Sequence, residues 1–206
     1  MVKVKICGIT NLEDALACAN AGTDALGFVF YKQSSRYIAP EKARAIIKQL
    51  PANIIKIGVF VNSREKTVKR IAKTCGLDIL QFHGDESPEF CRRFKSYKVI
   101  KAFKVAGHIP EEKIMKYRIF AYLFDTHSNS QAGGTGRAFD WRLLGHLGHI
   151  KQPIFLSGGL SEKNIRAAIE TTRPQWVDIS SHLELRPGKK DHKKVEAFIK
   201  AAKGLA

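Results

Sequence analysis

The sequence predicts an α/β fold, a (β/α)8 barrel, and three observations lead to it. Short β-branched or aromatic runs alternate with amphipathic segments along the whole chain, eight of each. Several runs, such as "IIKIGVFV" at 54–61, are almost wholly apolar, which is typical of parallel strands buried on both faces. A length of 206 residues suits eight compact βα units. Without a linker or low-complexity tract, residues 1–206 are expected to form a single domain.

Each predicted strand ends in polar or glycine residues, as a strand does where it leaves a buried sheet. The strands are predicted at Val2–Cys7, Ala25–Phe30, Ile54–Val61, Ile79–His83, Val99–Lys104, Ile119–Phe124, Pro153–Leu156 and Trp176–Ile179.

Helix signals follow each of these runs. Asn11 precedes the first helix as a cap, and prolines at 40, 88 and 110 occupy first-turn positions that tolerate a missing N–H. Gly22 and Gly76 stand where helices end. The helices are predicted at Leu12–Asn20, Pro40–Gln49, Arg64–Thr74, Pro88–Phe94, Pro110–Tyr117, Trp141–Leu147, Glu162–Glu170 and His192–Lys203. A doubly wound open sheet is the alternative, disfavoured because no G-x-G-x-x-G follows the first strand.

The formal net charge of +16 fits an anionic partner, either a small substrate or a nucleic acid, but it also fits a plain lysine-rich surface, so the charge alone decides little. Basic residues form no long tract and are not interleaved with aromatic residues, which argues against a nucleic-acid-binding domain. The four cysteines show no C-x-x-C pair, so neither a disulfide framework nor a zinc site is expected, and a reducing cytoplasm is favoured. No secretory signal or membrane-spanning apolar stretch is expected.

Chemically versatile side chains stand where the predicted strands end, which is where barrel active sites lie. These strand-end residues are Cys7, Arg36, Gln81, His83, Asp125, Asp178, Ser180 and Ser181. Asp125 ends the apolar run "IFAYLFD", where burying a carboxylate is unfavourable unless the group has a partner or a function. Catalysis is one such function, and helix capping is the alternative. Cys7 taken alone is better explained as a small buried hydrophobe than as a catalytic thiol. His83 and Arg36 have similar alternatives, a loop hydrogen bond and a surface position.

Two turns on the same predicted rim favour a phosphate site. Gly158 and Gly159 follow the seventh strand, and the hydroxyl-rich "VDISS" follows the eighth. Glycines let backbone N–H groups approach phosphate oxygens, although a plain tight turn is the alternative.

Seven segments occur together in order from Lys3 to Asp191: "KVKICGIT", "GFVFY..SSRYI", "LQFHGDE", "FDT......GGTG..FDW", "LSGGL", "VDISS" and "PGKKD". With them the chain closely resembles the phosphoribosylanthranilate isomerase family, phosphate-binding TIM-barrel enzymes of tryptophan biosynthesis. The resemblance implies an Amadori rearrangement, the third step from chorismate, with no cofactor and no metal. It also implies a phosphosugar substrate, no nucleic acid or membrane partner, and leaves monomer or homodimer open.

The resemblance also assigns roles residue by residue. Cys7 matches the family's general base and Asp125 its general acid, while Arg36 matches the contact to the anthranilate carboxylate. Phosphate binding falls to Gly134, Gly158, Gly159, Ser180 and Ser181, and substrate contacts to Gln81, His83 and Asp178.

A thiolate base and a carboxylic acid reverse the ordinary protonation of these groups. Reference pKa values of about 8.5 and about 3.9 leave a gap of about 4.6 units, roughly 6 kcal/mol. We expect burial to raise the pKa of Asp125 and nearby cations to lower the pKa of Cys7, so that the two titrate as a coupled pair.

Two departures from the family pattern are visible: His182 stands where Gly is usual after the serines, and Lys32 where Pro is common. The first leaves backbone contact of residue 182 with phosphate open. The nearest rival is the histidine-pathway isomerase family, which performs the same rearrangement with two carboxylates. Cys7 and Arg36 argue against it.

Overall fold

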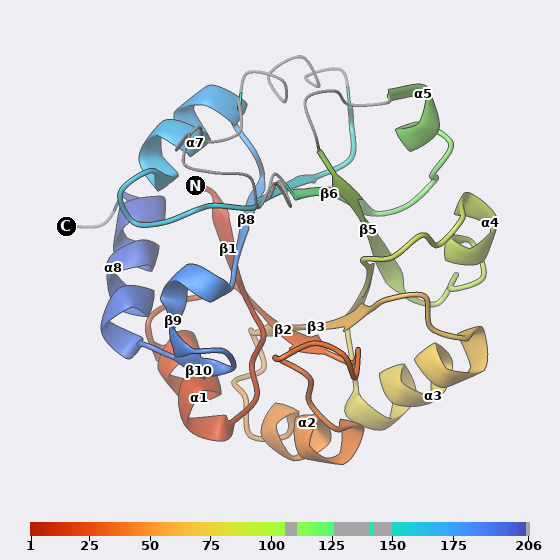
Figure 1. Ribbon diagram of the computed structural model, residues 1–206, viewed down its shortest axis with the longest axis horizontal. Coiled ribbons are helices and arrows are strands. Elements are labelled where there is room, and N and C mark those ends of the chain that lie inside the picture. Colours follow the sequence, from red (N-terminus) through yellow and green to blue (C-terminus); the bar gives the residue numbers. More distant parts are fainter. Residues whose placement is uncertain (106–110, 126–140, 142–149, 205–206) are drawn as a thin grey trace.

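The computed structural model describes residues 1–105, 111–125, 141 and 150–204, and its centre is a closed barrel of eight parallel strands (Figure 1). The strands are hydrogen-bonded in chain order, and β8 returns to pair with β1. They are β1 (Lys3–Cys7), β2 (Ala25–Val29), β3 (Ile55–Phe60), β4 (Ile79–Phe82), β5 (Lys98–Lys104), β6 (Ala121–Asp125), β7 (Ile154–Ser157) and β8 (Trp176–Ile179). The predicted barrel is confirmed.

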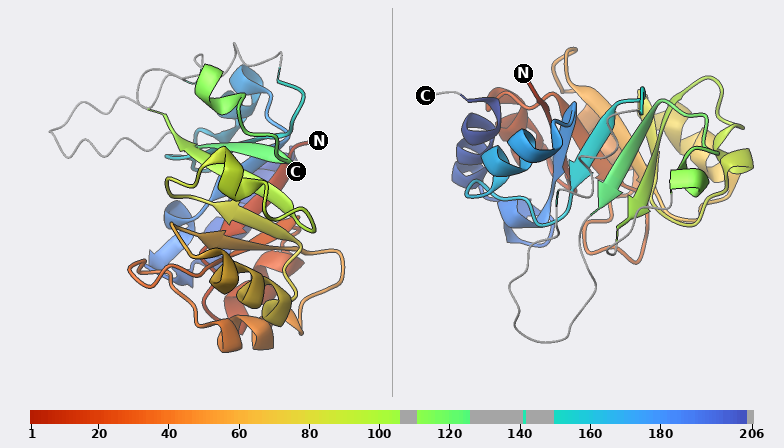
Figure 2. Two further views of the ribbon diagram at one scale, coloured as in Figure 1. Left: turned by 90° about the vertical axis from the view of Figure 1, so that its right-hand side faces the viewer. Right: turned by 90° about the horizontal axis from the view of Figure 1, so that it is seen from above.

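Helices cover the outside of the strands in all three views (Figures 1 and 2). Those described are α1 (Leu12–Asn20), α2 (Pro40–Ile47), α3 (Glu65–Cys75), α4 (Pro88–Cys91), α5 (Glu111–Ile114), α7 (Ile165–Thr172) and α8 (His192–Lys203). None of the described helices is long and apolar enough to span a membrane. The predicted helix at 141–147 lies outside the described residues except for Trp141.

Side-chain hydrogen bonds explain where two of these helices begin. The Asn11 carboxamide accepts a hydrogen bond from the Asp14 N–H and caps α1, as predicted. In the β7–α7 loop, Asn164 Oδ1 accepts from the Ser161 N–H while Asn164 Nδ2 donates to the Gly159 carbonyl. These local bonds compete with helical ones, so α7 begins at Ile165 instead of the predicted Glu162.

Three short elements after β8 were not predicted. The 3-10 helix η2 (Ser181–Leu183) is followed by β9 (Glu184–Arg186) and β10 (Lys189–Lys190), which form a small antiparallel hairpin. Figure 1 shows this β9–β10 hairpin beside α1 and α8. The sequence signal for it was the Pro187-Gly188 pair, a common turn dipeptide.

Two layers of apolar side chains form the core. The larger cluster lies between strands and helices, and a smaller one, including Ile57, Ile100, Leu123 and Phe155, fills the barrel. Because alternate strand residues face the same way, Asp125 shares the inward face of β6 with Leu123. The same alternation places polar residues above the interior apolar layer, toward the C-terminal ends of the strands.

Candidate active site

Cys7 is the last residue of β1, and its half-buried thiol faces a space left by a glycine on the next strand. Gly27 of β2 stands opposite Cys7 in the register. A β-carbon at Gly27 would lie 2.7 Å from the Cys7 Sγ, which no real contact tolerates. Gly8, with φ +80°, then turns the chain away, and a β-carbon there would lie 2.6 Å from the Arg36 Cδ. Both glycines make room for site side chains.

Lys5, two residues before Cys7 on the same face of β1, is fully buried beneath the thiol. Its Nζ lies 2.8 Å from Asp178 Oδ1 on β8, and a side-chain hydrogen bond joins it to Cys7. Burial acts to lower the pKa of Lys5, but Asp178 and Cys7 outweigh it and raise that pKa, so Lys5 is an ammonium ion. Asp178 is therefore placed as the partner of a buried lysine, one layer below the thiol.

The pKa of Cys7 is raised above its ordinary value, because burial outweighs the opposing ammonium groups of Lys5 and Lys190. The expectation that nearby cations would lower this pKa is wrong in its net direction. Lys5 and Lys190 do lower the pKa of Cys7, but desolvation of the thiolate raises it by more than they lower it.

Arg36, in the loop after β2, is held by a carboxylate that sequence reasoning missed. Its Nε lies 2.9 Å from Glu184 Oε1 and its Nη2 lies 2.6 Å from Glu184 Oε2. Glu184 is the first residue of β9 and its side chain is almost fully buried. Only the tertiary contact reveals this partner, since 148 residues separate the two in sequence.

Three predicted residues, Gln81, His83 and Asp125, form a chain across the ends of β4 and β6. The Gln81 Nε2 lies 3.0 Å from His83 Nδ1, and His83 Nε2 lies 3.4 Å from Asp125 Oδ2. With the amide donating to Nδ1, a neutral His83 ring carries its proton on Nε2, facing the Asp125 carboxylate. Gln81 Oε1 is buried and has no partner within the described part of the chain. The predicted acid therefore has an imidazole for a neighbour.

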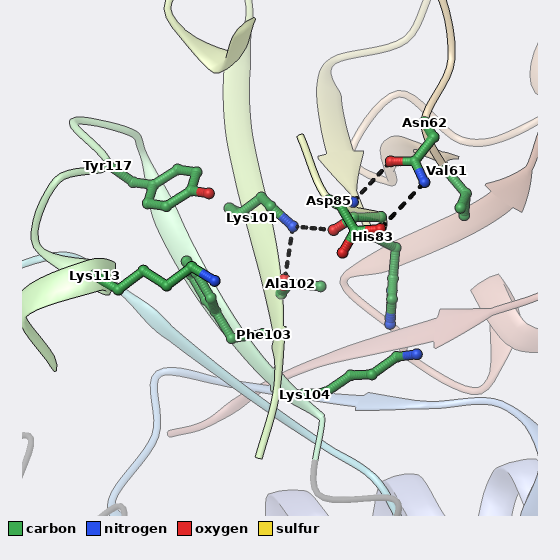
Figure 3. A pocket seen from close by; sticks show the side chains of 11 residues that line it. Val61, Asn62, His83, Asp85, Lys101, Ala102, Phe103, Lys104, Lys113 and Tyr117 are labelled. Carbon is green, nitrogen blue, oxygen red and sulfur yellow. Dashed lines mark hydrogen bonds between the residues drawn. The ribbon is translucent and has the colours of Figure 1, made fainter. Parts of the chain in front are cut away.

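A cavity of about 380 Å³ opens beside His83 at the ends of β3, β4 and β5 (Figure 3). Lys101, which lines it, donates from Nζ to the carbonyl groups of Gly84 (2.7 Å) and Ala102 (2.9 Å). Burial lowers the pKa of Lys101, with Glu86 acting in the opposite sense. Figure 3 shows His83 and Lys104 on the same side of this cavity. His83 thus lies both beside Asp125 and in the wall of this cavity, whose lining holds three lysines and one aspartate.

The two predicted phosphate turns follow β7 and β8 directly. Gly158 and Gly159 both have positive φ, 89° and 63°, a conformation that favours glycine. Ser180 donates from Oγ to the Cys7 carbonyl at 3.0 Å, which ties the second turn to the end of β1. Ser181 and His182 are exposed on η2. Gly134, the other predicted phosphate contact, lies outside the described residues.

The fold and these strand-end side chains define a class, a (β/α)8-barrel enzyme with a thiol, a carboxylate and an arginine on one rim. Among the residues described, no group of three or more His, Cys, Asp or Glu side chains could hold a metal ion. Comparisons with known proteins narrow the class to a family. A family model described as N-(5′-phosphoribosyl)anthranilate isomerase matches residues 4–201.

Curated relatives and solved structures agree with that match. The N-(5′-phosphoribosyl)anthranilate isomerase of Pelobacter propionicus is 50% identical over 203 residues, 98% of this chain and 96% of its own. The crystal structure of the Thermotoga maritima enzyme is 47% identical with a TM-score of 0.93, covering both chains fully. A phosphoribosyl anthranilate isomerase in complex with reduced 1-(o-carboxyphenylamino)-1-deoxyribulose 5-phosphate is 45% identical with a TM-score of 0.91, again over both full chains. The chain belongs to the N-(5′-phosphoribosyl)anthranilate isomerase family, and is thus an isomerase.

Proposed function

We propose that this protein converts N-(5-phosphoribosyl)anthranilate into 1-(2-carboxyphenylamino)-1-deoxyribulose 5-phosphate in tryptophan synthesis. One observation carries the assignment beyond the family match: a half-buried thiol ends β1 and a carboxylate ends β6 of the same barrel. A proton-transfer rearrangement of a sugar needs a base and an acid so placed.

Asp125 is the general acid in this proposal. It protonates the furanose ring oxygen as the bond from that oxygen to C1 breaks, which leaves a protonated Schiff base between C1 and the anthranilate nitrogen. His83 and, through it, Gln81 hold the carboxyl group in place by the contacts described above.

Cys7 is the general base. Its thiolate removes the proton from C2, the electron pair moves into the C1–C2 bond, and an enolamine results. Loss of the hydroxyl proton at C2 and protonation at C1 then give the ketone. The adjacent Lys5 ammonium stabilises the thiolate against the desolvation that raises the pKa of Cys7.

In this proposal the phosphate binds at the turns that follow β7 and β8. In the closed barrel, β7 and β8 lie between β6 and β1. The turns that follow them, Gly158-Gly159 and Ser180-Ser181, therefore occupy the arc of the rim between the strand of the acid and the strand of the base. Backbone N–H groups of both turns and the exposed Ser181 hydroxyl suit a phosphate dianion, while the Ser180 hydroxyl donates to the Cys7 carbonyl. Arg36 completes the site by binding the anthranilate carboxylate, because a guanidinium matches a carboxylate in charge and geometry.

We also place the protein in the cytoplasm. All four cysteines are free, and Cys18, Cys75 and Cys91 are buried. Burial raises the pKa of Cys18 to about 12 and that of Cys91 to about 12, which leaves both thiols inert.

The deciding experiment is a fluorescence assay with freshly generated phosphoribosylanthranilate. We expect wild-type protein to consume the substrate, and Cys7→Ala and Asp125→Ala each to lower kcat by at least about 100-fold, the low end for a lost acid or base. Cys18→Ala is the matched control, a thiol lost on α1, and should retain kcat. Wild-type protein that leaves the substrate untouched would refute the proposal.

A further inference from the structure

We propose that Glu184 and Lys190 are positioning residues that aim Arg36 at the substrate carboxylate, and so set the preference for a carboxylated aromatic amine. The inference rests on the proposed function and extends it to residues of the β9–β10 hairpin. Both side chains are almost fully buried, whereas about a quarter of the Arg36 side chain is exposed.

The hydrogen bonds from Arg36 to Glu184 use one edge of the guanidinium and leave a second edge available to a ligand. Glu184 accepts from Nε and Nη2, which is the side edge of the planar group. The end edge, formed by Nη1 and the second N–H of Nη2, is then directed away from Glu184. No described residue accepts a hydrogen bond from Nη1. A guanidinium can bind a carboxylate at each of these edges, so a ligand carboxylate fits the end edge.

Lys190 supplies the charge that this arrangement needs. Arg36 and Glu184 alone are a neutral pair with little attraction for an anion. The Lys190 Nζ lies 2.9 Å from Glu184 Oε1, so the three groups together carry one net positive charge. The β9–β10 register sets Lys190 directly opposite Glu184, which makes the pair a consequence of the hairpin.

Lys190 also connects this triad to the catalytic corner. Its Nζ donates to the Cys7 carbonyl at 2.6 Å and to the Ser180 carbonyl at 3.2 Å. The ends of β1 and β8 and the guanidinium of Arg36 are thus fixed relative to one another by one buried ammonium group. A pre-positioned arginine loses less side-chain entropy when it binds a carboxylate.

The test compares two ligands that differ only in the carboxyl group. Calorimetry would give Kd for reduced 1-(2-carboxyphenylamino)-1-deoxyribulose 5-phosphate and for its phenylamino analogue without the carboxylate. The Kd of the phenylamino analogue divided by the Kd of the carboxylated ligand measures carboxylate recognition. We expect Glu184→Gln and Lys190→Met each to lower this ratio at least about tenfold, and Arg36→Met to bring it near one. In the Arg36→Met background, Glu184→Gln should change the ratio no further.

The control is Glu13→Gln, which removes a carboxylate that pairs with Lys189 of the same hairpin but does not touch Arg36. It should leave the ratio unchanged. A merely structural role of Glu184 would weaken both ligands equally, and a ratio equal to that of wild type in Glu184→Gln overturns the inference alone. If that variant does not fold, Glu184→Asp withdraws the carboxylate by one methylene, and its ratio decides in the same way. Wild-type protein that binds neither ligand would overturn the proposed function itself.

Discussion

The thiol of Cys7 occupies its position because of a residue that has no side chain. Gly27 faces the same corner from β2, and a β-carbon there would meet the Cys7 Sγ at 2.7 Å and the Cys7 Cα at 3.1 Å. Backbone atoms cannot give way as the end of a flexible side chain can. The Cys7 thiol at the end of β1 therefore requires a glycine at position 27 of β2.

Gly27→Ala should accordingly lower kcat at least about tenfold, because displacing the thiol by about 1 Å disrupts proton-transfer geometry. The unfolding free energy should fall by about 1–3 kcal/mol from overpacking. Gly58→Ala on β3 is the matched control, since its β-carbon would clash with Leu77 Cδ1, away from the thiol. Steady-state kinetics on folded protein, with urea unfolding alongside, would test this. Equal kcat values for the two variants would contradict it.

At the scale of elements, the β9–β10 hairpin is attached to the start of α1 by one buried carboxylate. Asp14 accepts hydrogen bonds from Lys189 Nζ (2.9 Å) and the Lys190 N–H (2.8 Å), and lies 2.9 Å from His192 Nε2. Burial alone would raise the pKa of Asp14, but these hydrogen bonds outweigh it and hold the pKa at about 2. Through Lys190, the attachment reaches Cys7 and Arg36.

Asp14→Asn should therefore destabilise the protein in a pH-dependent way. A folded-state pKa below the unfolded value of 3.8 gives stability that is present above about pH 4 and lost as the pH falls toward 2. The shift corresponds to about 2 kcal/mol. Urea unfolding at neutral pH should show a loss of about that size, and the difference from wild type should shrink in acid.

Glu13→Gln is the comparison for Asp14→Asn. Glu13 also pairs with Lys189 but is largely exposed, so its loss should cost less than about 1 kcal/mol at any pH. A difference between wild type and Asp14→Asn that stayed constant down to about pH 3 would show that Asp14 acts through packing and not through its charge.

At the scale of the whole molecule, basic residues outnumber acidic ones by 35 to 19, which gives a net charge of +16. Lys104 and Lys113 line the cavity beside His83. Arg36 and Lys190 lie near the C-terminal ends of β2 and β1. The proposed substrate carries a phosphate and a carboxylate. A positive field around the rim would raise the rate at which such an anion arrives.

We expect kcat/KM for phosphoribosylanthranilate to fall several-fold as salt is raised from about 10 mM to about 1 M, over which the Debye length shrinks from about 30 to about 3 Å. Changes in kcat at saturating substrate should be much smaller, because steering acts on the encounter. Stopped-flow or initial-rate fluorescence would measure both. A kcat/KM that did not change with salt would show that the excess positive charge does not steer the substrate.

Much of the element pattern was readable from the sequence because it follows local rules. Apolar runs and caps such as Asn11 and Gly76 are properties of neighbouring residues, so all eight strands were located to within two residues at either end. Helices α4 and α5 were predicted too long. After Cys91 the chain continues in tight turns, such as Phe94 N–H to the Cys91 carbonyl, which a periodic pattern cannot distinguish from a helix.

The sequence by itself determined the barrel, the family and the strand-end positions of Cys7, Asp125 and Arg36. Tertiary structure alone decided what surrounds them: Lys5 and Asp178 beneath the thiol, His83 beside Asp125, and Glu184 with Lys190 behind Arg36. It also decided that burial raises the pKa of Cys7 against the nearby cations. The physical reason is range. Strand and helix signals act between near neighbours, whereas desolvation and ion pairing also depend on groups from distant parts of the chain, such as Lys5 and Asp178, 173 residues apart.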